Sequence, residues 1–148
     1  VNLYVYVGNN PVLLIDPSGT NATLWTWFGH VGISVDDPNN PGGTITIQQG
    51  PDPNVSLFDN FVGGVNGKGV PGVVSISKNG NMPLSVPLMT KIQSADEDSA
   101  LISQAQDLQK QYAAGQMNYS WSGYTANGKG QNCIGFAVGL MNNTTRGK

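Results

Sequence analysis

The alternation of apolar residues between positions 30 and 48 constrains the fold of this chain more than any other feature. Valine or isoleucine occupies every second position of residues 30–35, which is typical of a strand with one buried face. Residues 36–43 are rich in Asp, Asn, Pro and Gly, and residues 44–48 then alternate again as Thr-Ile-Thr-Ile-Gln. We therefore predict two strands joined by a hairpin-like turn, with an apolar face that other elements must cover.

Two amphipathic helices are predicted to provide this cover. Ser94 is followed three residues later by Glu97, as in a capping box, and apolar residues then recur at helical spacing up to Gly115, which fits a C-terminal cap. We expect a helix over residues 95–114. Apolar residues at helical spacing near the end of the chain predict a last helix that begins near Asn132. The pattern favours an α+β fold, in which a small antiparallel sheet packs against helices.

The remaining segments give weaker signals. Residues 50–72 contain scattered Gly, Pro and Asn, and we expect a loop there. A second loop, polar, aromatic and rich in glycine, is predicted over residues 115–131. Residues 73–77 and 84–89 are weaker strand candidates.

The composition suits one domain and argues against several classes of partner. The chain has 148 residues, of which 39% are hydrophobic and only 11% charged, and its 20 Gly and 9 Pro indicate many turns. The net charge is −2 and the seven Lys and Arg residues are scattered, so we expect no nucleic-acid partner, which a basic stripe would serve. One cysteine excludes an internal disulfide. No segment approaches the run of about 18 apolar residues that a membrane span needs.

We expect neither a metal nor an organic cofactor. A metal site wants several His or Cys ligands, and the chain has one of each. No phosphate-binding or dinucleotide-binding glycine fingerprint occurs. The acidic run at residues 96–98 is explained by capping of the predicted helix.

The single histidine and the single cysteine form the most informative pair. His30 begins the first predicted strand, and Cys133 lies in the first turn of the last predicted helix, after a glycine-rich loop. A thiolate nucleophile needs a lowered pKa, which a helix N-terminus and a neighbouring imidazolium supply. A histidine on a strand that faces a cysteine on a helix is the geometry of papain-like hydrolases. The alternative is a packed core cysteine and a structural histidine, which are the commoner roles of such residues.

The first nineteen residues, VNLYVYVGNNPVLLIDPSG, contain two short strand candidates separated by turn clusters. They resemble the end of the RHS-repeat-associated core, whose signature NLYxYxxNNPxxxxDPxG they match. The resemblance implies that residues 1–19 are the C-terminal end of an RHS core and that residues 20–148 form a variable toxin domain. Members of that family often cleave themselves just after this motif, commonly beside a Leu, whereas Thr20 stands in that place here.

A second resemblance involves GHVGISV at residues 29–35 and NCIGFA at residues 132–137. These motifs resemble those of circularly permuted papain-like hydrolases, which include permuted members of the NlpC group and the lecithin:retinol acyltransferase-like proteins. In these proteins HxGIxV precedes NCxxFv, whereas unpermuted relatives carry DCSGF first and the histidine later. The resemblance spans roughly residues 24–143. It implies a permuted papain-like, NlpC-type fold with Cys133 as the nucleophile at a helix N-terminus and His30 as the base.

The same resemblance implies a third catalytic residue on the strand that follows the histidine. A polar side chain there orients the imidazole. Alternation places Gln48 on the polar face of that strand, so Gln48 is our candidate, with Asp36 as the alternative. The acyltransferase-like members carry a second histidine near this point, and this chain has none.

The oxyanion that forms during acyl transfer needs hydrogen-bond donors beside the nucleophile. The backbone N–H of Cys133 is one candidate. Tyr119, Trp121 and Tyr124 in the preceding loop are candidates for lining the substrate cleft, and a tyrosine could be a second donor. Simple packing of the loop is the alternative for these aromatic residues. Asn132 is a further candidate, although a helix cap is its commoner role.

The expected function is that of an antibacterial toxin, a cysteine hydrolase that cleaves an acyl or amide bond, with a peptide of peptidoglycan as the first choice of substrate. Membrane phospholipids and a glutamine of a target protein are the alternatives, and residues such as Phe58, Phe61, Val62 and Val65 could line a cleft for lipid. Other classes are a toxin with nuclease or ADP-ribosyltransferase chemistry, and a non-enzymatic binding module. The RHS resemblance implies a cognate immunity protein, the RHS shell and a secretion machinery as partners, and action in the periplasm or envelope of a rival bacterium.

Overall fold

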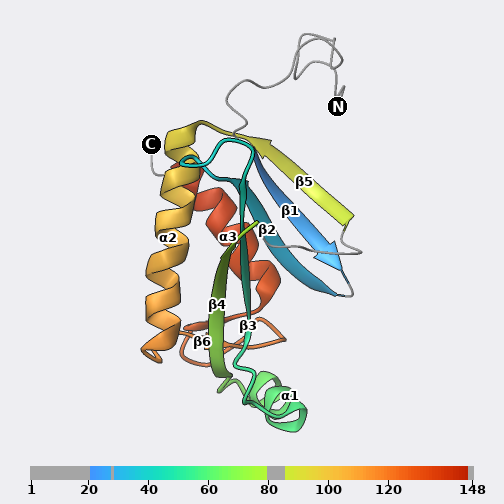
Figure 1. Ribbon diagram of the computed structural model, residues 1–148. Helices are drawn as coiled ribbons and strands as arrows, with labels where there is room; N and C mark the ends of the chain where they lie inside the picture. Colours follow the sequence, from blue (N-terminus) through green and yellow to red (C-terminus); the bar gives the residue numbers. More distant parts are fainter. Residues whose placement is uncertain (1–20, 28, 80–85, 147–148) are drawn as a thin grey trace.

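The computed structural model describes residues 21–27, 29–79 and 86–146 of the chain (Figure 1). The segment predicted to be the end of an RHS core, residues 1–19, lies outside the described residues. In chain order, the helices and strands are β1 (Asn21–Trp27), β2 (His30–Asp36), β3 (Thr44–Pro51), α1 (Leu57–Asn66), β4 (Val70–Lys78), β5 (Val86–Ile92), α2 (Ala95–Ala113), β6 (Asn118–Tyr119), β7 (Gly130–Gln131) and α3 (Cys133–Arg146).

In the described part of the chain, seven strands form one sheet in the order β5-β1-β2-β3-β4-β6-β7. Neighbouring strands from β5 to β6 are antiparallel, whereas the two-residue strands β6 and β7 run parallel. The sheet curls around α3, and α2 packs against α3 and β4 (Figure 1). The fold is therefore α+β, as predicted, but the sheet is mixed and not purely antiparallel.

The predicted hairpin is confirmed, and it forms the centre of the sheet. Strands β2 and β3 pair in a register that places Gly32 opposite Gln48 and Asp36 opposite Thr44. The turn between them closes with a backbone hydrogen bond of 3.0 Å from the N–H of Asp37 to the carbonyl of Gly43. The apolar side chains of both strands face the helices and form much of the core.

Both predicted helices are confirmed, together with their end signals. The N–H of Glu97 donates to Oγ of Ser94 over 3.2 Å, which caps α2, and Gly115 follows the helix with a φ of 75°. At the start of α3, the N–H of Gly135 donates to Oδ1 of Asn132 over 2.8 Å. Asn132 is therefore the N-terminal cap of α3, and the helix begins at the following residue.

One core connects the sheet with α2 and α3. Its buried members are Ala22, Leu24, Val31, Ile33, Val35, Ile45, Ile47 and Val74 from the sheet, and Leu101, Ala105, Tyr112, Cys133, Phe136, Ala137, Leu140 and Met141 from the helices. The single cysteine is thus a member of the apolar cluster, at the end of α3 where the helix begins. This packing fixes α3 against the strand that carries the single histidine.

The prediction of a loop over residues 50–72 is wrong, because this segment contains α1 and the start of β4. Oγ of Ser56 accepts a hydrogen bond of 3.1 Å from the N–H of Asp59 and caps α1. Gly63 and Gly64 looked like loop residues, but they are buried where α1 packs. A Cβ at Gly63 would lie 2.6 Å from the carbonyl oxygen of Gly69, so glycine here permits a close approach of two segments.

The other differences concern short or edge strands. Strand β1 was not predicted, and two-residue strands occur within the loop predicted over residues 115–131. The candidate at 73–77 is confirmed and extended as β4. The candidate at 84–89 corresponds to β5, although residues 84 and 85 lie outside the described residues.

Candidate active site

The thiol of Cys133 occupies the N-terminus of α3. The side chain is only 6% exposed and belongs to the core cluster that joins α3 to the sheet. Backbone N–H groups of Val31 and Ile134 hydrogen-bond to the sulfur. Such donors stabilise a thiolate more than a thiol, as the N-terminus of a helix does in general.

His30 is the first residue of β2, and its side chain hydrogen-bonds to the side chain of Cys133. The two residues are 103 positions apart in the sequence, and the packing of α3 on β2 brings them together. The expected pairing of the single histidine with the single cysteine is therefore present as a direct contact.

The pKa values of the two groups shift in opposite directions. Burial raises the pKa of the Cys133 thiol, but the hydrogen bond and the charge of His30, with the two backbone donors, outweigh burial and leave this pKa below 9.0. The hydrogen bond to Cys133 raises the pKa of His30 above 6.5, helped by the charge of the thiolate and opposed by burial. Each shift favours the charged form of its group, so the geometry favours a thiolate–imidazolium pair.

Gln48 contacts the other side of the imidazole. Its Oε1 lies 3.3 Å from Nε2 of His30, and since an amide oxygen only accepts, Nε2 is the donor. This arrangement leaves Nδ1 for the hydrogen bond with Cys133. Asp36, the alternative orienting residue, lies at the opposite end of β2, where its Oδ2 accepts from the N–H of Asn21 over 2.7 Å.

The three aromatic loop candidates divide into two groups. Tyr119 belongs with the thiol: burial raises the pKa of its phenol, and the negative charge of Cys133 raises it further. Trp121 and Tyr124 lie instead against α1. The indole N–H of Trp121 donates to the carbonyl of Phe61 over 3.1 Å and its ring stacks on Phe61, while a Cβ at Gly67 would lie 2.8 Å from the ring of Tyr124.

Gln49 is a polar residue of this region that the sequence did not single out. It is 1% exposed, and its Nε2 donates to the hydroxyl of Tyr112 over 3.0 Å and to the carbonyl of Gln131 over 2.9 Å. Strand alternation, which identified Gln48, places Gln49 on the opposite face, where an apolar residue was expected. A glutamine at a position where strand alternation predicts an apolar residue was the signal that could have identified Gln49.

An exposed apolar surface lies on α1. It consists of Leu57, Phe58, Phe61 and Val65, and Leu57 and Phe58 are 88% and 74% exposed. Val62, which was expected to join it, is only partly exposed. A shallow hollow of about 340 Å³ opens between Leu57, Asn60, Phe61 and Trp121. Trp121 connects this surface to the start of α3, because its carbonyl accepts a hydrogen bond of 3.5 Å from Nδ2 of Asn132.

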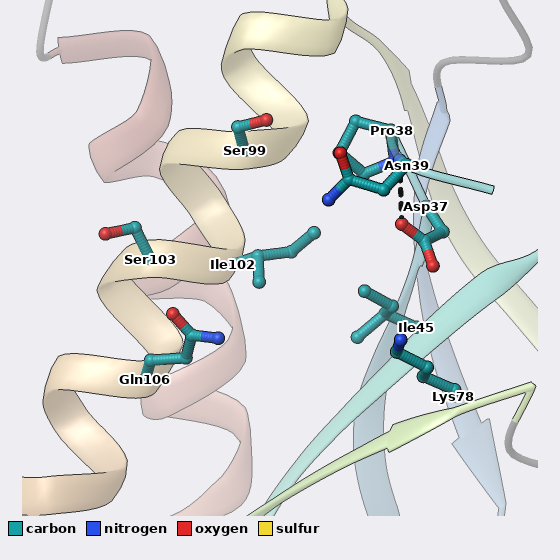
Figure 2. A pocket seen from close by; sticks show the side chains of 9 residues that line it. All are labelled: Asp37, Pro38, Asn39, Ile45, Lys78, Ser99, Ile102, Ser103 and Gln106. Carbon is teal, nitrogen blue, oxygen red and sulfur yellow. Dashed lines mark hydrogen bonds between the residues drawn. The ribbon is translucent and has the colours of Figure 1, made fainter.

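A separate cavity of about 350 Å³ lies between α2 and the β2–β3 turn. Figure 2 shows the residues that line it: Ser99, Ile102, Ser103 and Gln106 of α2, Asp37, Pro38 and Asn39 of the turn, and Ile45 and Lys78 of the sheet. Oδ1 of Asp37 accepts from the N–H of Asn39 over 2.9 Å, so this carboxylate shapes the turn. Neither Cys133 nor His30 lines this cavity.

Two features are absent from residues 21–27, 29–79 and 86–146. Within these ranges, no three or more His, Cys, Asp or Glu side chains gather as a metal site would require. No helix in them combines the length and the apolar character needed to cross a membrane.

Comparison with protein-family models, with curated proteins and with solved structures finds no match to this chain. The geometry of the fold and of the site characterises the protein. It is an α+β domain in which a cysteine at a helix N-terminus, a strand histidine and a glutamine on the next strand form a continuous hydrogen-bonded row.

Proposed function

We propose that this chain is the toxin domain of an RHS protein and acts as a cysteine hydrolase with a permuted papain-like fold. The hydrogen bond between His30 and Cys133, with Gln48 behind the imidazole, is the observation that carries the proposal. A buried thiol that packs only as a core residue has no need of a charged partner, whereas a nucleophile does. The RHS signature in residues 1–19 supports the toxin role.

The mechanism follows from these positions. The thiolate of Cys133 attacks the acyl carbon, and the carbonyl oxygen becomes an oxyanion that the N–H of Cys133 and the phenol of Tyr119 stabilise. His30 gives its proton to the leaving group as the bond to that group breaks, which leaves a thioester on Cys133. His30 then takes a proton from water as the water oxygen attacks the thioester. The bond between carbon and sulfur breaks, the acid is released, and Cys133 leaves as the thiolate beside the imidazolium of His30.

A peptide amide of peptidoglycan is the first substrate class for this chemistry. The second is the acyl ester of a membrane phospholipid, and one observation favours it. Trp121 hydrogen-bonds to Phe61 of α1 and accepts a bond from Asn132, the residue before the thiol, and α1 exposes large apolar side chains that a soluble peptide does not require. Both substrates place the action of the toxin at the envelope of a target bacterium, with a cognate immunity protein as the partner that protects the producer.

Incubation of the purified domain with peptidoglycan sacculi and, separately, with phospholipid vesicles tests the proposal. Release of cell-wall peptides or of fatty acids is expected from the wild type and not from Cys133→Ala. Val138→Ala, which changes an exposed residue of the same helix, is the matched control and should keep the activity. Equal release by wild type and Cys133→Ala, or release of neither product, would contradict the proposal.

A further inference from the structure

We propose that Gln49 is a positioning residue that holds the segment before Cys133 in register with the strand of His30. The inference rests on the proposed hydrolase function, and it assigns a role to a buried amide that this function does not otherwise use. Gln48 and Gln49 are consecutive residues of β3, and their side chains leave the strand on opposite sides.

The first of these glutamines reaches His30, and the second reaches the chain just before the nucleophile. Nε2 of Gln49 donates to the carbonyl of Gln131 over 2.9 Å, two residues before Cys133. The same carbonyl accepts from the N–H of Ser120 over 3.1 Å, next to Tyr119. One carbonyl therefore joins β3, the loop of Tyr119 and the start of α3.

The second hydrogen bond of Gln49 connects it to the core. The hydroxyl of Tyr112 on α2 accepts from the same Nε2 over 3.0 Å, and the ring of Tyr112 meets Phe136 of α3 edge to face. With the side chain 1% exposed, bulk water does not compete for these contacts. Adjacent residues of β3 thus hold His30 directly and Cys133 through Gln131. A slip of α3 along the sheet would break the link between Gln49 and Gln131.

The consequence concerns the geometry of the thiol and not only the stability of the fold. A displacement of about 1 Å at a reacting group can cost about 10²-fold in rate. Loss of the Gln49 link should therefore move the sulfur away from its partner on β2, and the pKa of Cys133 should rise towards that of an ordinary thiol. A role confined to stability would lower the melting temperature and leave this pKa unchanged.

The test is the rate of iodoacetamide alkylation of Cys133 against pH in the whole chain. Gln49→Met keeps the size of the side chain and removes both donors, and the half-point of its alkylation curve should lie above that of the wild type. Tyr112→Phe is the matched control, because it removes the other partner of Gln49 and leaves the link to Gln131, so its half-point should stay at the wild-type value. Circular dichroism and melting temperature show which variants fold.

If Gln49→Met does not fold, Gln49→Asn decides, because it keeps an amide but shortens its reach by one methylene. It too should raise the half-point. An unchanged half-point in a folded Gln49 variant, or an equal rise in Tyr112→Phe, overturns the positioning role while the proposed hydrolase stands. A wild-type half-point at or above about 8.5, the value of a free cysteine, overturns the activated thiol itself and the present inference with it.

Discussion

Helices α3 and α1 use their apolar residues in opposite ways. Helix α3 buries Phe136, Leu140 and Met141 in the core, whereas α1 buries two glycines and exposes Leu57 and Phe58. Burial of one large apolar side chain stabilises a fold by about 1.5–3 kcal/mol, which α3 gains and α1 largely does not. Under the proposed function, α3 carries the reacting thiol, whereas α1 leaves an apolar surface exposed among the described residues.

The largest expected effect lies on the α3 side and concerns the partner of the thiol. His30→Gln should lower hydrolysis on the order of 10⁴-fold, since it removes both the base and the charge opposite Cys133. The burial that raises the pKa of Cys133 would remain, so alkylation should require more alkaline conditions than in the wild type. In the wild type, the activity should follow a bell-shaped pH profile. The acidic limb reports formation of the Cys133 thiolate, whose pKa is lowered from 9.0, and the alkaline limb reports loss of the proton of His30, whose pKa is raised from 6.5.

Rates of hydrolysis and of alkylation, measured between pH 5 and pH 10 for the wild type and for His30→Gln, test the loss of activity and the shift of the thiol pKa. An unchanged alkylation curve in His30→Gln would show that the histidine does not activate the thiol, and the mechanism would lose its base.

Removal of one phenylalanine from each helix tests the structural side of the comparison. Phe136→Ala should lower the free energy of unfolding by about 3–5 kcal/mol, because the side chain is buried in the core. Phe58→Ala should change it by no more than about 0.5 kcal/mol, because the side chain lies in solvent. Urea unfolding followed by circular dichroism measures both. Similar losses in the two variants would mean that the exposed side of α1 is covered within the folded chain.

Two tyrosines of the segment between α2 and α3 test which side of that segment takes part in the reaction. Tyr119→Phe should lower kcat by about 10²–10³-fold with little change in KM, the usual loss for one oxyanion donor. Tyr124→Phe, on the α1 side of the same loop, should leave both constants near the wild-type values. Steady-state kinetics on whichever substrate the domain cleaves would decide. Equal effects of the two substitutions would remove the assignment of Tyr119 as a donor.

The smallest expected effect concerns the outer side of α1. Leu57→Ser should weaken hydrolysis of phospholipid vesicles by about tenfold, the equivalent of one apolar contact with lipid. Leu88→Ser makes the same change at an exposed leucine of β5 and is the matched control, which should hydrolyse the vesicles at the wild-type rate. Thermal melting of both variants is the control for folding. Loss of peptidoglycan cleavage by Leu57→Ser would contradict a role restricted to lipid.

Much of the fold was predictable because local signals agreed with the tertiary structure. The capping box at Ser94 and the alternation that leads to Gln48 both depend on neighbours in the sequence, and both predictions are confirmed. The segment that contains α1 was misread, because Gly63 and Gly64 normally argue against a helix. Only the close packing of β4 and Trp121 on these glycines explains their presence.

The site shows the same division. Residue type and position made Cys133 and His30 candidates, since a thiolate needs a helix N-terminus and an imidazole. The resemblance to permuted papain-like hydrolases strengthened that pair and, with strand alternation, made Gln48 the third candidate. The contact between them, and the place of Gln49 behind the nucleophile, depend on how α3 packs on a curled sheet. That packing joins residues far apart in the chain through apolar burial, which has no direction of its own and leaves no local pattern in the sequence.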